Sequence, residues 1–495
     1  MHLLLDAPNL TMGLFLLLAV GLALAFEFIN GFHDTANAVA TVIYTNSLPA
    51  TLAVVWSGLW NLAGVLCSSG AVAFAVVALL PVDLVLNAGS GAGLAMVFSL
   101  LISAIIWNLG TWWVGLPASS SHSLVGAILG VGLGHSVMQT GRVLGSGVNW
   151  GKAAEVGISL MVSPLVGFLG GALTLLLLKA LVRKPELYRA PGKQPPPAWI
   201  RGLLVLTCTG VSFAHGSNDG QKGMGLVMLI LVGILPGSYA LRMNTNPAVI
   251  RQVAEDAGPA VRILERHAGG RELAPEAASR ELSRFLNYES RAGSLTGPAL
   301  AAKGRSLERR LAGIQGFAQL DAKDRAGLRE DAFLLVDSLR KLERTGAFPD
   351  PGERAALKTF EGHLVRATQF IPFWVKLSVA LALGLGTMVG WKRIVVTVGE
   401  KIGKDHLSYA QGASAEMVAM VTIGAADLLG FPVSTTHVLS SGVAGTMAAN
   451  HSGIQGGTVR SMLLAWILTV PVCVFLGAST FALGLYLALH VFGLQ

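Results

Sequence analysis

The sequence predicts an all-α polytopic membrane protein, because its composition is strongly apolar and its apolar segments have the length of a bilayer. The chain has 495 residues, of which 53% are hydrophobic and 13% are charged, and its mean hydropathy is +0.61. Soluble domains carry about 25% charged residues. Five of the segments that are long enough to span hydrocarbon are 92–114, 156–182, 373–389, 410–427 and 462–494. We expect about ten to twelve passes, counting discontinuous helices.

The basic charge of the chain does not indicate nucleic-acid binding. The formal net charge is +8, but the Lys and Arg residues are spread over short loops and one hydrophilic insert, as is typical of loops on the cytoplasmic side. Cys67, Cys208 and Cys473 are odd in number and share no close spacing, so we predict packing roles without a disulfide framework or a metal site. The N-terminus lacks the basic start of a signal peptide, and we predict none.

Two polar motifs of eight residues lie within apolar segments. The first, Gly-Phe-His-Asp-Thr-Ala-Asn-Ala at 31–38, interrupts an apolar stretch that runs from 12 to 43. The second, Gly-Ser-Asn-Asp-Gly-Gln-Lys-Gly at 216–223, again places an Asp three residues after the first Gly. An ionisable side chain at the centre of a membrane helix costs at least ~2.5–3.5 kcal/mol. We therefore predict a broken helix at each motif, whose free backbone groups and carboxylate face a binding site.

A second pair of motifs predicts two helix starts inside the membrane. Residues 115–122 read Gly-Leu-Pro-Ala-Ser-Ser-Ser-His, and residues 430–437 read Gly-Phe-Pro-Val-Ser-Thr-Thr-His. Proline suits the first turn of a helix and Ser or Thr suits its cap. Because both motif pairs recur in the same order, the chain contains an internal duplication.

The second repeat carries an insert. Asp34 and His122 are 88 residues apart, whereas Asp219 and His437 are 218 apart, an excess of 130 residues. The stretch 240–370 holds 38 of the chain's 64 charged residues, 21 basic and 17 acidic, so we predict that it is a hydrophilic helical insert. The predicted division is 1–182 for the first transmembrane repeat, 183–201 for a basic linker, 202–239 for the start of the second repeat, 240–370 for the insert and 371–495 for the remainder.

Basic loops predict the orientation of the chain. Lys and Arg cluster at 183–201 and at 392–404, so we place both loops in the cytoplasm and the N-terminus, which lacks Lys and Arg, outside. If the chain crosses once between the first basic loop and the insert, and once between the insert and the second basic loop, the insert lies on the side opposite both.

Hydroxyl groups beside helix N-termini predict a site for a tetrahedral oxyanion. Backbone N–H groups and the helix dipole favour negative charge at such positions. Taken singly, a Ser or Thr in a membrane helix more often caps or bonds its own backbone, but recurrence at matched spacing favours a binding role for each motif as a unit. The candidate residues are Ser119, Ser120, Ser121, Ser434, Thr435 and Thr436.

Oxygen-bearing side chains of the Asp motifs predict a companion cation or proton. A hard cation prefers carboxylate and amide oxygens, and a carboxylate can instead accept a proton. A co-transported cation cancels the membrane potential's opposition to an entering anion, which is about 2.3 kcal/mol per charge per 100 mV. Lys222 lies close enough to Asp219 for an ion pair or an anion contact, although it could also extend toward the membrane surface. The candidate residues are Asp34, Asn37, Asn218 and Asp219.

These motifs resemble the PiT family of inorganic phosphate transporters, and the likeness is close to the bacterial low-affinity carriers. Residues 31–38 are similar to the family's signature, residues 215–223 to its bacterial second copy, and 117–122 and 432–437 to its Pro-x-Ser-x-x-His elements. The resemblance spans both halves of the chain and leaves only the insert uncovered. It implies a transporter of inverted repeats that carries orthophosphate inward, driven by a cation gradient. It also implies a dimer, since members of the family often form dimers.

By position, the resemblance assigns Asp34, Asn37 and Asp219 to the cation and phosphate site, and both hydroxyl triplets to the phosphate oxygens. Sodium-coupled relatives resemble this chain at Glu416, but they tend to have a matching acid where this sequence has Asn61. The second Asp motif also ends in Gln-Lys in place of Ala-Asn. A lost carboxylate and a gained Lys weaken a sodium site, so we predict proton coupling, which in bacterial relatives is associated with neutral divalent-metal–phosphate complexes.

The prediction is therefore a proton-coupled phosphate symporter in the bacterial inner membrane, lipid-embedded and homodimeric, with no resident cofactor or metal. Glu416 and Lys222 complete its coupling and phosphate residues, respectively. The nearest alternative is sodium-coupled uptake of phosphate or of another tetrahedral oxyanion such as arsenate or sulfate. An intramembrane hydrolase using Ser119 or Ser434 with a histidine and Asp34 is a second alternative, and a phosphate-sensing receptor is a third. Duplicated Ser and His residues suit a site between repeats better than a single catalytic centre.

Overall fold

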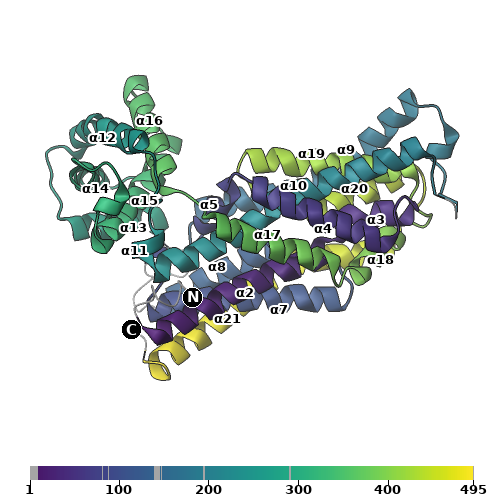
Figure 1. Ribbon diagram of the computed structural model, residues 1–495, viewed down its shortest axis with the longest axis horizontal. Helices are drawn as coiled ribbons and strands as arrows, with labels where there is room; N and C mark the ends of the chain where they lie inside the picture. Colours follow the sequence, from purple (N-terminus) through teal and green to yellow (C-terminus); the bar gives the residue numbers. More distant parts are fainter. Residues whose placement is uncertain are drawn as a thin grey trace.

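The computed structural model describes residues 9–80, 82–86, 88–138, 145, 148–192, 195–288 and 291–493, and within them the regular structure is helical (Figure 1). The helices of the first half are α2 (Leu10–Asp34), α3 (Ala36–Tyr44), α4 (Ala50–Cys67), α5 (Ala71–Val77), α6 (Val82–Leu86), α7 (Gly91–Trp113), α8 (Ser120–Met138) and α9 (Trp150–Leu181).

The second half repeats this series around a separate helical bundle. Its membrane part contains η1 (Pro185–Leu187), α10 (Ala198–Ile234), α11 (Pro236–Tyr239), α17 (Phe373–Met388), α18 (Lys392–Glu400), α19 (Tyr409–Leu428), α20 (Thr435–Ala449) and α21 (Gly456–His490). The bundle contains α12 (Pro247–Ala268), α13 (Pro275–Tyr288), α14 (Thr296–Leu311), η2 (Phe317–Gln319), α15 (Ala322–Arg344) and α16 (Pro351–Thr368).

Seven of the described helices are long and apolar enough to cross a membrane, or eight if the bent pair of α16 and α17 is one span. This is fewer than the expected ten to twelve passes. Two reasons are geometric: α3 continues α2 as one 35-residue span, and α17 and α20 have only 16 and 15 residues. Large apolar side chains on the outer faces, such as Leu173 and Ile467, are exposed as lipid contact requires.

The two halves interlock through equivalent helix pairs. α8 packs along α21, and its counterpart α20 packs along α9; in the same way, α10 packs along α4 and α2 along α17. α2 starts at the end of the molecule that carries the bundle and runs away from it, whereas α10 runs toward it (Figure 1). The predicted duplication is therefore an inverted repeat, in which each half completes the core of the other.

The first glycine of each Asp motif permits these helices to touch. A Cβ on Gly31 would overlap the carbonyl oxygen of Leu383 on α17, and one on Gly216 would overlap that of Asn61 on α4. Since only glycine allows so close a backbone approach, both motifs begin with a packing requirement.

The prediction of two broken helices is wrong in its second half. α10 is continuous through 216–223, and in the first half Thr35 alone separates α2 from α3. The Thr35 hydroxyl donates to the carbonyls of Gly31 (2.6 Å) and Thr387 (3.0 Å), so even this interruption is bonded. The polar motif residues thus reach the site as side chains of nearly intact helices.

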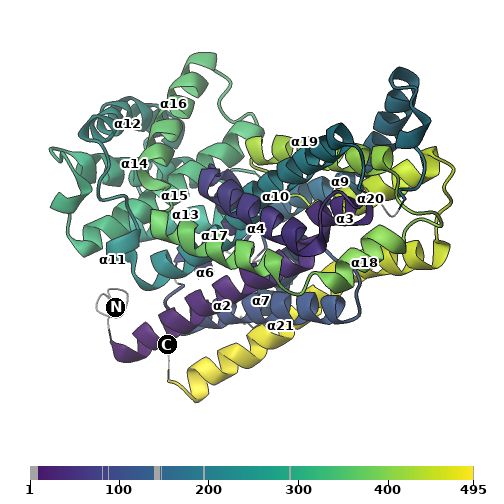
Figure 2. The ribbon, with the colours of Figure 1, turned by 45° about the vertical axis from the view of Figure 1, so that its right-hand side comes forward.

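The helices α12 to α16 have a hydrophobic core of their own, and they sit at one end of the membrane helices (Figures 1 and 2). Arg344 pairs with Glu155 of α9 at 2.9 Å, and Asn287 accepts the backbone N–H of Val82 at 3.1 Å. Arg329 of α15 faces α5 and α10, where it donates to the Thr368 carbonyl at 2.7 Å and where burial lowers its pKa to about 10. The bundle lies at the end opposite η1 and α18, in agreement with the predicted placement relative to the basic loops.

Candidate functional site

The two hydroxyl motifs form matching helix starts, as predicted. α8 begins at Ser120 and α20 begins at Thr435. Ser119 and Ser434 each accept the backbone N–H three residues further on, at 3.2 Å in both cases. These two serines therefore cap helices, and the hydroxyls that follow them are the ones directed into the site.

Asp34, at the end of α2, lies where both helix starts meet. One carboxylate oxygen accepts the hydroxyl of Thr436, and the other accepts those of Ser120 (3.3 Å) and Thr435 (3.4 Å). Asp34 is 2% exposed. A carboxylate that accepts several hydroxyl hydrogen bonds is stabilised in a buried position, and these bonds come from both repeats.

Asp219, on α10, is the equivalent residue of the second repeat, and it pairs with a buried ammonium. Lys222 Nζ lies 2.8 Å from Asp219 Oδ1 and also donates to the Ser121 hydroxyl on α8. Lys222 is 1% exposed, so it does not extend to the membrane surface. A Lys at this depth requires a partner, and the ion pair supplies it.

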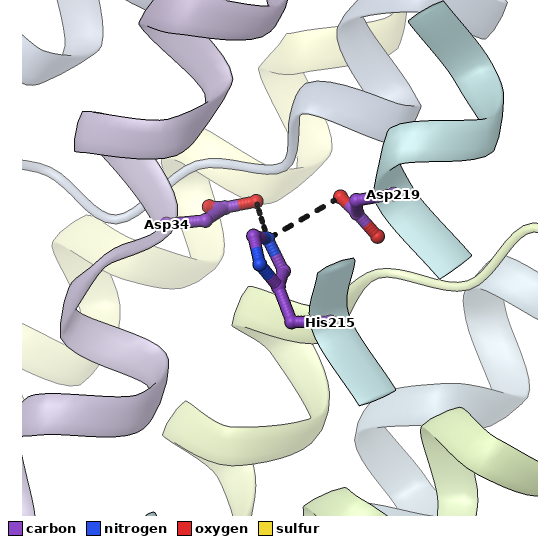
Figure 3. Close-up of side chains that lie close together, drawn as sticks. All are labelled: Asp34, His215 and Asp219. Carbon is purple, nitrogen blue, oxygen red and sulfur yellow. Dashed lines mark ion pairs between the residues drawn. The ribbon is translucent and has the colours of Figure 1, made fainter. Parts of the chain in front are cut away.

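His215 joins the two aspartates (Figure 3). Its Nε2 lies 3.6 Å from Asp34 Oδ2 and 3.7 Å from Asp219 Oδ2, and its Nδ1 lies 2.6 Å from Asn61 Oδ1. The three ligand atoms lie within 4.8 Å of one another, as in some metal sites. The ammonium of Lys222 beside Asp219 opposes a metal cation there, so this residue set fits a metal poorly.

The seventh position of each Asp motif makes the same connection with a different charge. Asn37 donates to Thr435 (3.3 Å) and Thr436 (3.2 Å), and its counterpart Lys222 donates to Ser121. The two halves of the site therefore share one hydrogen-bonding plan, in which a neutral amide in the first repeat corresponds to an ammonium in the second.

The remaining predicted residues lie at different distances from this centre. Asn218 donates to the carbonyl of Phe431 in the second hydroxyl motif at 3.1 Å. Glu416, on α19, is buried and accepts the hydroxyls of Thr41 and Thr207, so it contacts the threonine two turns beyond Asp34 and not the aspartate itself.

The position of Glu416 also corrects the expected pairing with Asn61. The loops before α8 and α20 match residue for residue, with Gly115 and Gly430 both in the left-handed conformation at φ values of +71° and +72°. Counting back along α7 from this match, the first-repeat counterpart of Glu416 is Leu101, which is fully buried. Asn61 lies on a different helix, α4, because the two positions belong to different parts of the repeat.

The motif histidines pack against each other. The rings of His122 and His437 lie 4.5 Å apart between centroids, and His437 stacks on Trp466 at 4.0 Å. The two helix starts thus touch through equivalent side chains. This contact explains why each motif ends in His without assigning it a ligand.

Sequence reasoning missed several buried polar residues at and around the site. Asp427, at the end of α19, accepts the hydroxyl of Ser217 at 2.6 Å and the amide of Gln221, while the Gln221 carbonyl oxygen accepts the N–H of Val72 at the start of α5. Glu27 and its neighbour Asn30 are also fully buried on α2. The sequence signal for Glu27 was its position, seven residues before Asp34 on the same helix face.

Interlocked inverted repeats around a buried, charged and polar centre define a membrane transport protein. In agreement with this class, residues 30–477 match the sequence model of the phosphate transporter family. The chain belongs to this family, as the motif resemblance indicated, and it is a multi-pass membrane protein.

The chain is similar along nearly its whole length to curated relatives. It is 42% identical to the "Low-affinity inorganic phosphate transporter PitA" of Escherichia coli (strain K12), covering 96% of this chain and 98% of that protein. It is also 42% identical to PitB of the same strain, covering 96% and 97%. A solved structure titled "The sodium-dependent phosphate transporter" shares the fold, with a TM-score of 0.51 and 20% identity over 95% of this chain and 98% of that chain.

Proposed function

We propose that this protein imports inorganic phosphate together with protons. It works as a multi-pass carrier in the bacterial inner membrane, the location of a phosphate uptake system built from apolar helices. The observation that carries the proposal is the meeting of Asp34, Asp219, Lys222 and both helix starts in one buried centre. Donors for an oxyanion and acceptors for a cation are thus contributed by both repeats to one place.

Phosphate oxygens would take the hydroxyl and ammonium donors of this centre. In the structure, Thr436, Thr435 and Ser120 donate to Asp34, and Lys222 donates to Ser121. A bound phosphate would accept from these same groups at two helix N-termini, where the dipoles favour an anion. Ser119 and Ser434 contribute by holding the helix starts in place.

The positive charge of Lys222 in the Asp219 half of the site favours a proton over sodium as the coupled ion. The Lys222 ammonium already occupies the space between Asp219 and Ser121, where a sodium ion would need oxygen ligands only. Asp34, Asn37 and Asn218 remain available for the coupling step. Glu416 provides a further buried carboxyl, which accepts the Thr41 hydroxyl. A proton, or a neutral metal–phosphate complex with a proton, would offset the opposing membrane potential.

Sodium coupling is the second candidate, because the solved structure that shares this fold is that of a sodium-dependent phosphate transporter. The hydrolase alternative is weaker, because Ser119 and Ser434 accept backbone N–H groups and thus act as helix caps. No cofactor is needed for the proposed transport. A homodimer embedded in lipid is the expected assembly.

The proposal is tested by uptake of radiolabelled phosphate into liposomes that hold the purified protein. We expect uptake under an inward proton gradient without sodium, competition by arsenate, and little competition by sulfate. Asp34→Asn should reduce this uptake at least about tenfold, since a lost hydrogen bond to a charged acceptor costs about 1.5–3 kcal/mol. Unchanged uptake by this variant would refute the site, and phosphoester turnover without uptake would favour the hydrolase.

A further inference from the structure

Glu27 is a buried acidic residue that the proposed phosphate site does not use. It lies on α2, is 0% exposed, and has one carboxylate oxygen 3.3 Å from the amide of Asn30. Its other oxygen, Oε1, is buried without a hydrogen-bond partner, as is the Asn30 carbonyl oxygen. Unpaired polar atoms at such depth are rare and require an explanation.

Glu27 begins a row of buried polar residues that leads through the site. Residues three or four apart share one helix face, and here they continue over about 21 Å of helix, the rise of 14 residues. Thr41, at the far end, donates to Glu416, so a buried carboxyl lies at each end. The row consists of Glu27, Asn30, Asp34, Asn37 and Thr41.

The charged groups that face Glu27 are both on α10. Asp219 and Lys222 interact with it electrostatically, and the backbone of Gly223 lies against it, so close that a Cβ there would stand 2.6 Å from the Glu27 carboxyl carbon. α7 has no charged residue, and the charged residue on α17, Lys376, donates to the Ser68 carbonyl at 2.8 Å. A proton on Glu27 therefore alters the field at the Asp219 and Lys222 pair.

Glu27 and Glu416 differ in how they are held. Both oxygens of Glu416 accept threonine hydroxyls, whereas Glu27 accepts from one side-chain amide, and its other oxygen is held by no side chain and has only the backbone of Gly223 beside it. A carboxyl with open hydrogen-bonding capacity can gain and lose a proton without breaking a network. Of these two acids, Glu27 is the one that its surroundings leave free to exchange a proton.

We propose that Glu27 carries the proton that accompanies phosphate, an inference that rests on the proposed function. Glu27 takes one proton from the outer side as its carboxylate becomes a neutral acid, and it returns the proton to the inner side after phosphate leaves. The proton neutralises a negative charge beside the Asp219 and Lys222 pair, so the Lys222 ammonium becomes more available to phosphate. Proton binding at Glu27 and phosphate binding at the site are thereby coupled. Asn30 positions the carboxyl for this exchange.

The test compares two transport modes of Glu27→Gln in liposomes. Net uptake under a proton gradient should fall at least about twentyfold, whereas phosphate–phosphate exchange at equal pH should change less than about threefold, because exchange needs no cycle of proton release. Glu27→Asp should restore part of the net uptake. Glu155→Gln, at a partly exposed carboxylate outside the row, is the control and should leave both modes unchanged.

The outcomes separate this proposal from the proposed function. If wild-type uptake follows the proton gradient and Glu27→Gln still follows it, the role of Glu27 is refuted while the transport function stands. Loss of exchange together with net uptake would also refute it, since Glu27 would then serve folding or phosphate binding. Wild-type uptake that needs sodium and ignores the proton gradient would overturn both proposals at once.

Discussion

The two aspartates of the repeats occupy equivalent positions in unequal surroundings. Asp34 is held by neutral hydroxyls from both helix starts, whereas Asp219 is paired with the Lys222 ammonium at 2.8 Å. Equivalent helix pairs surround the two aspartates, α17 against α2 and α4 against α10, so the difference in charge comes from the side chains. Duplication provides a common arrangement, and among the differences between the two Asp motifs, Lys222 in the place of Asn37 is the one that gives the two halves of the site different charges.

The largest expected effect of this difference is on stability. Asp219→Asn leaves the Lys222 ammonium buried without its counter-charge, which should cost about 3–5 kcal/mol. Asp34→Asn leaves no ammonium without its counter-charge, because the basic neighbours of Asp34 are the imidazoles of His33 and His215, and it should cost about 1 kcal/mol, the scale of one altered hydrogen bond. Thermal unfolding of the purified variants in detergent would measure both.

A double variant controls for this interpretation. Asp219→Asn with Lys222→Met removes both charges and should recover most of the lost stability. Equal destabilisation by Asp34→Asn and Asp219→Asn would show that the ion pair with Lys222 does not distinguish the two halves of the site.

Because both repeats pack in the same way, we expect the first glycines of the two Asp motifs to tolerate substitution equally poorly. Gly31→Ala and Gly216→Ala should each destabilise by about 1–3 kcal/mol, because the added Cβ meets a backbone carbonyl of the partner helix. Gly21→Ala is the matched control on α2, where a Cβ meets nothing within 4 Å. Unfolding midpoints compare the three, and a tolerant Gly216 would show that the two halves pack differently.

Lys222→Asn makes the second site resemble the first and so sharpens the comparison. Proton-driven phosphate uptake should fall about tenfold, equivalent to about 1.4 kcal/mol, and stimulation by sodium should appear, since a cation can then enter between Asp219 and Ser121. Uptake assays with and without sodium provide the readout. Lys376→Asn, which removes an ammonium outside the site, should show no sodium response; the same response in both variants would contradict the role of Lys222.

The smallest expected effects are at the helix caps. Ser119→Ala and Ser434→Ala should each cost about 1 kcal/mol, because each removes an equivalent side-chain cap. Equal shifts in the unfolding midpoint would support the matched helix starts. A cost at one serine alone would show that the other hydroxyl has a different main partner.

The sequence predicted the parts of the site that depend on residue type and spacing. Membrane class, the internal duplication and both helix starts follow from hydropathy and from Pro, Ser and His at fixed offsets. The expected helix break at 216–223 was wrong because it assumed that unwound backbone would compensate the buried Asp219, whereas the Lys222 ammonium on the same continuous helix does so. The side chain of Lys222 is itself placed by Ser121 of α8, a contact that local sequence does not reveal.

Other features required knowledge of spatial neighbours. Glu27 is one acid in an apolar run, and its proposed role depends on the backbone of Gly223 on α10, which lies against it only in the folded chain. The counterpart of Glu416 was assigned to Asn61, whereas the helix register identifies Leu101. The neighbours of Glu27 and the counterpart of Glu416 depend on how the two repeats pack and align, which neighbouring residues in the sequence do not determine.

The coupled ion is the property of this transporter on which the proposed roles of Lys222 and Glu27 depend most. The decisive measurement is phosphate accumulation in liposomes under an inward proton gradient alone and, separately, under an inward sodium gradient alone. We predict accumulation with the proton gradient, its abolition by a protonophore, and none with sodium. Accumulation that requires sodium and persists with the protonophore would contradict the proposal that the Lys222 ammonium beside Asp219 takes the place of a sodium ion.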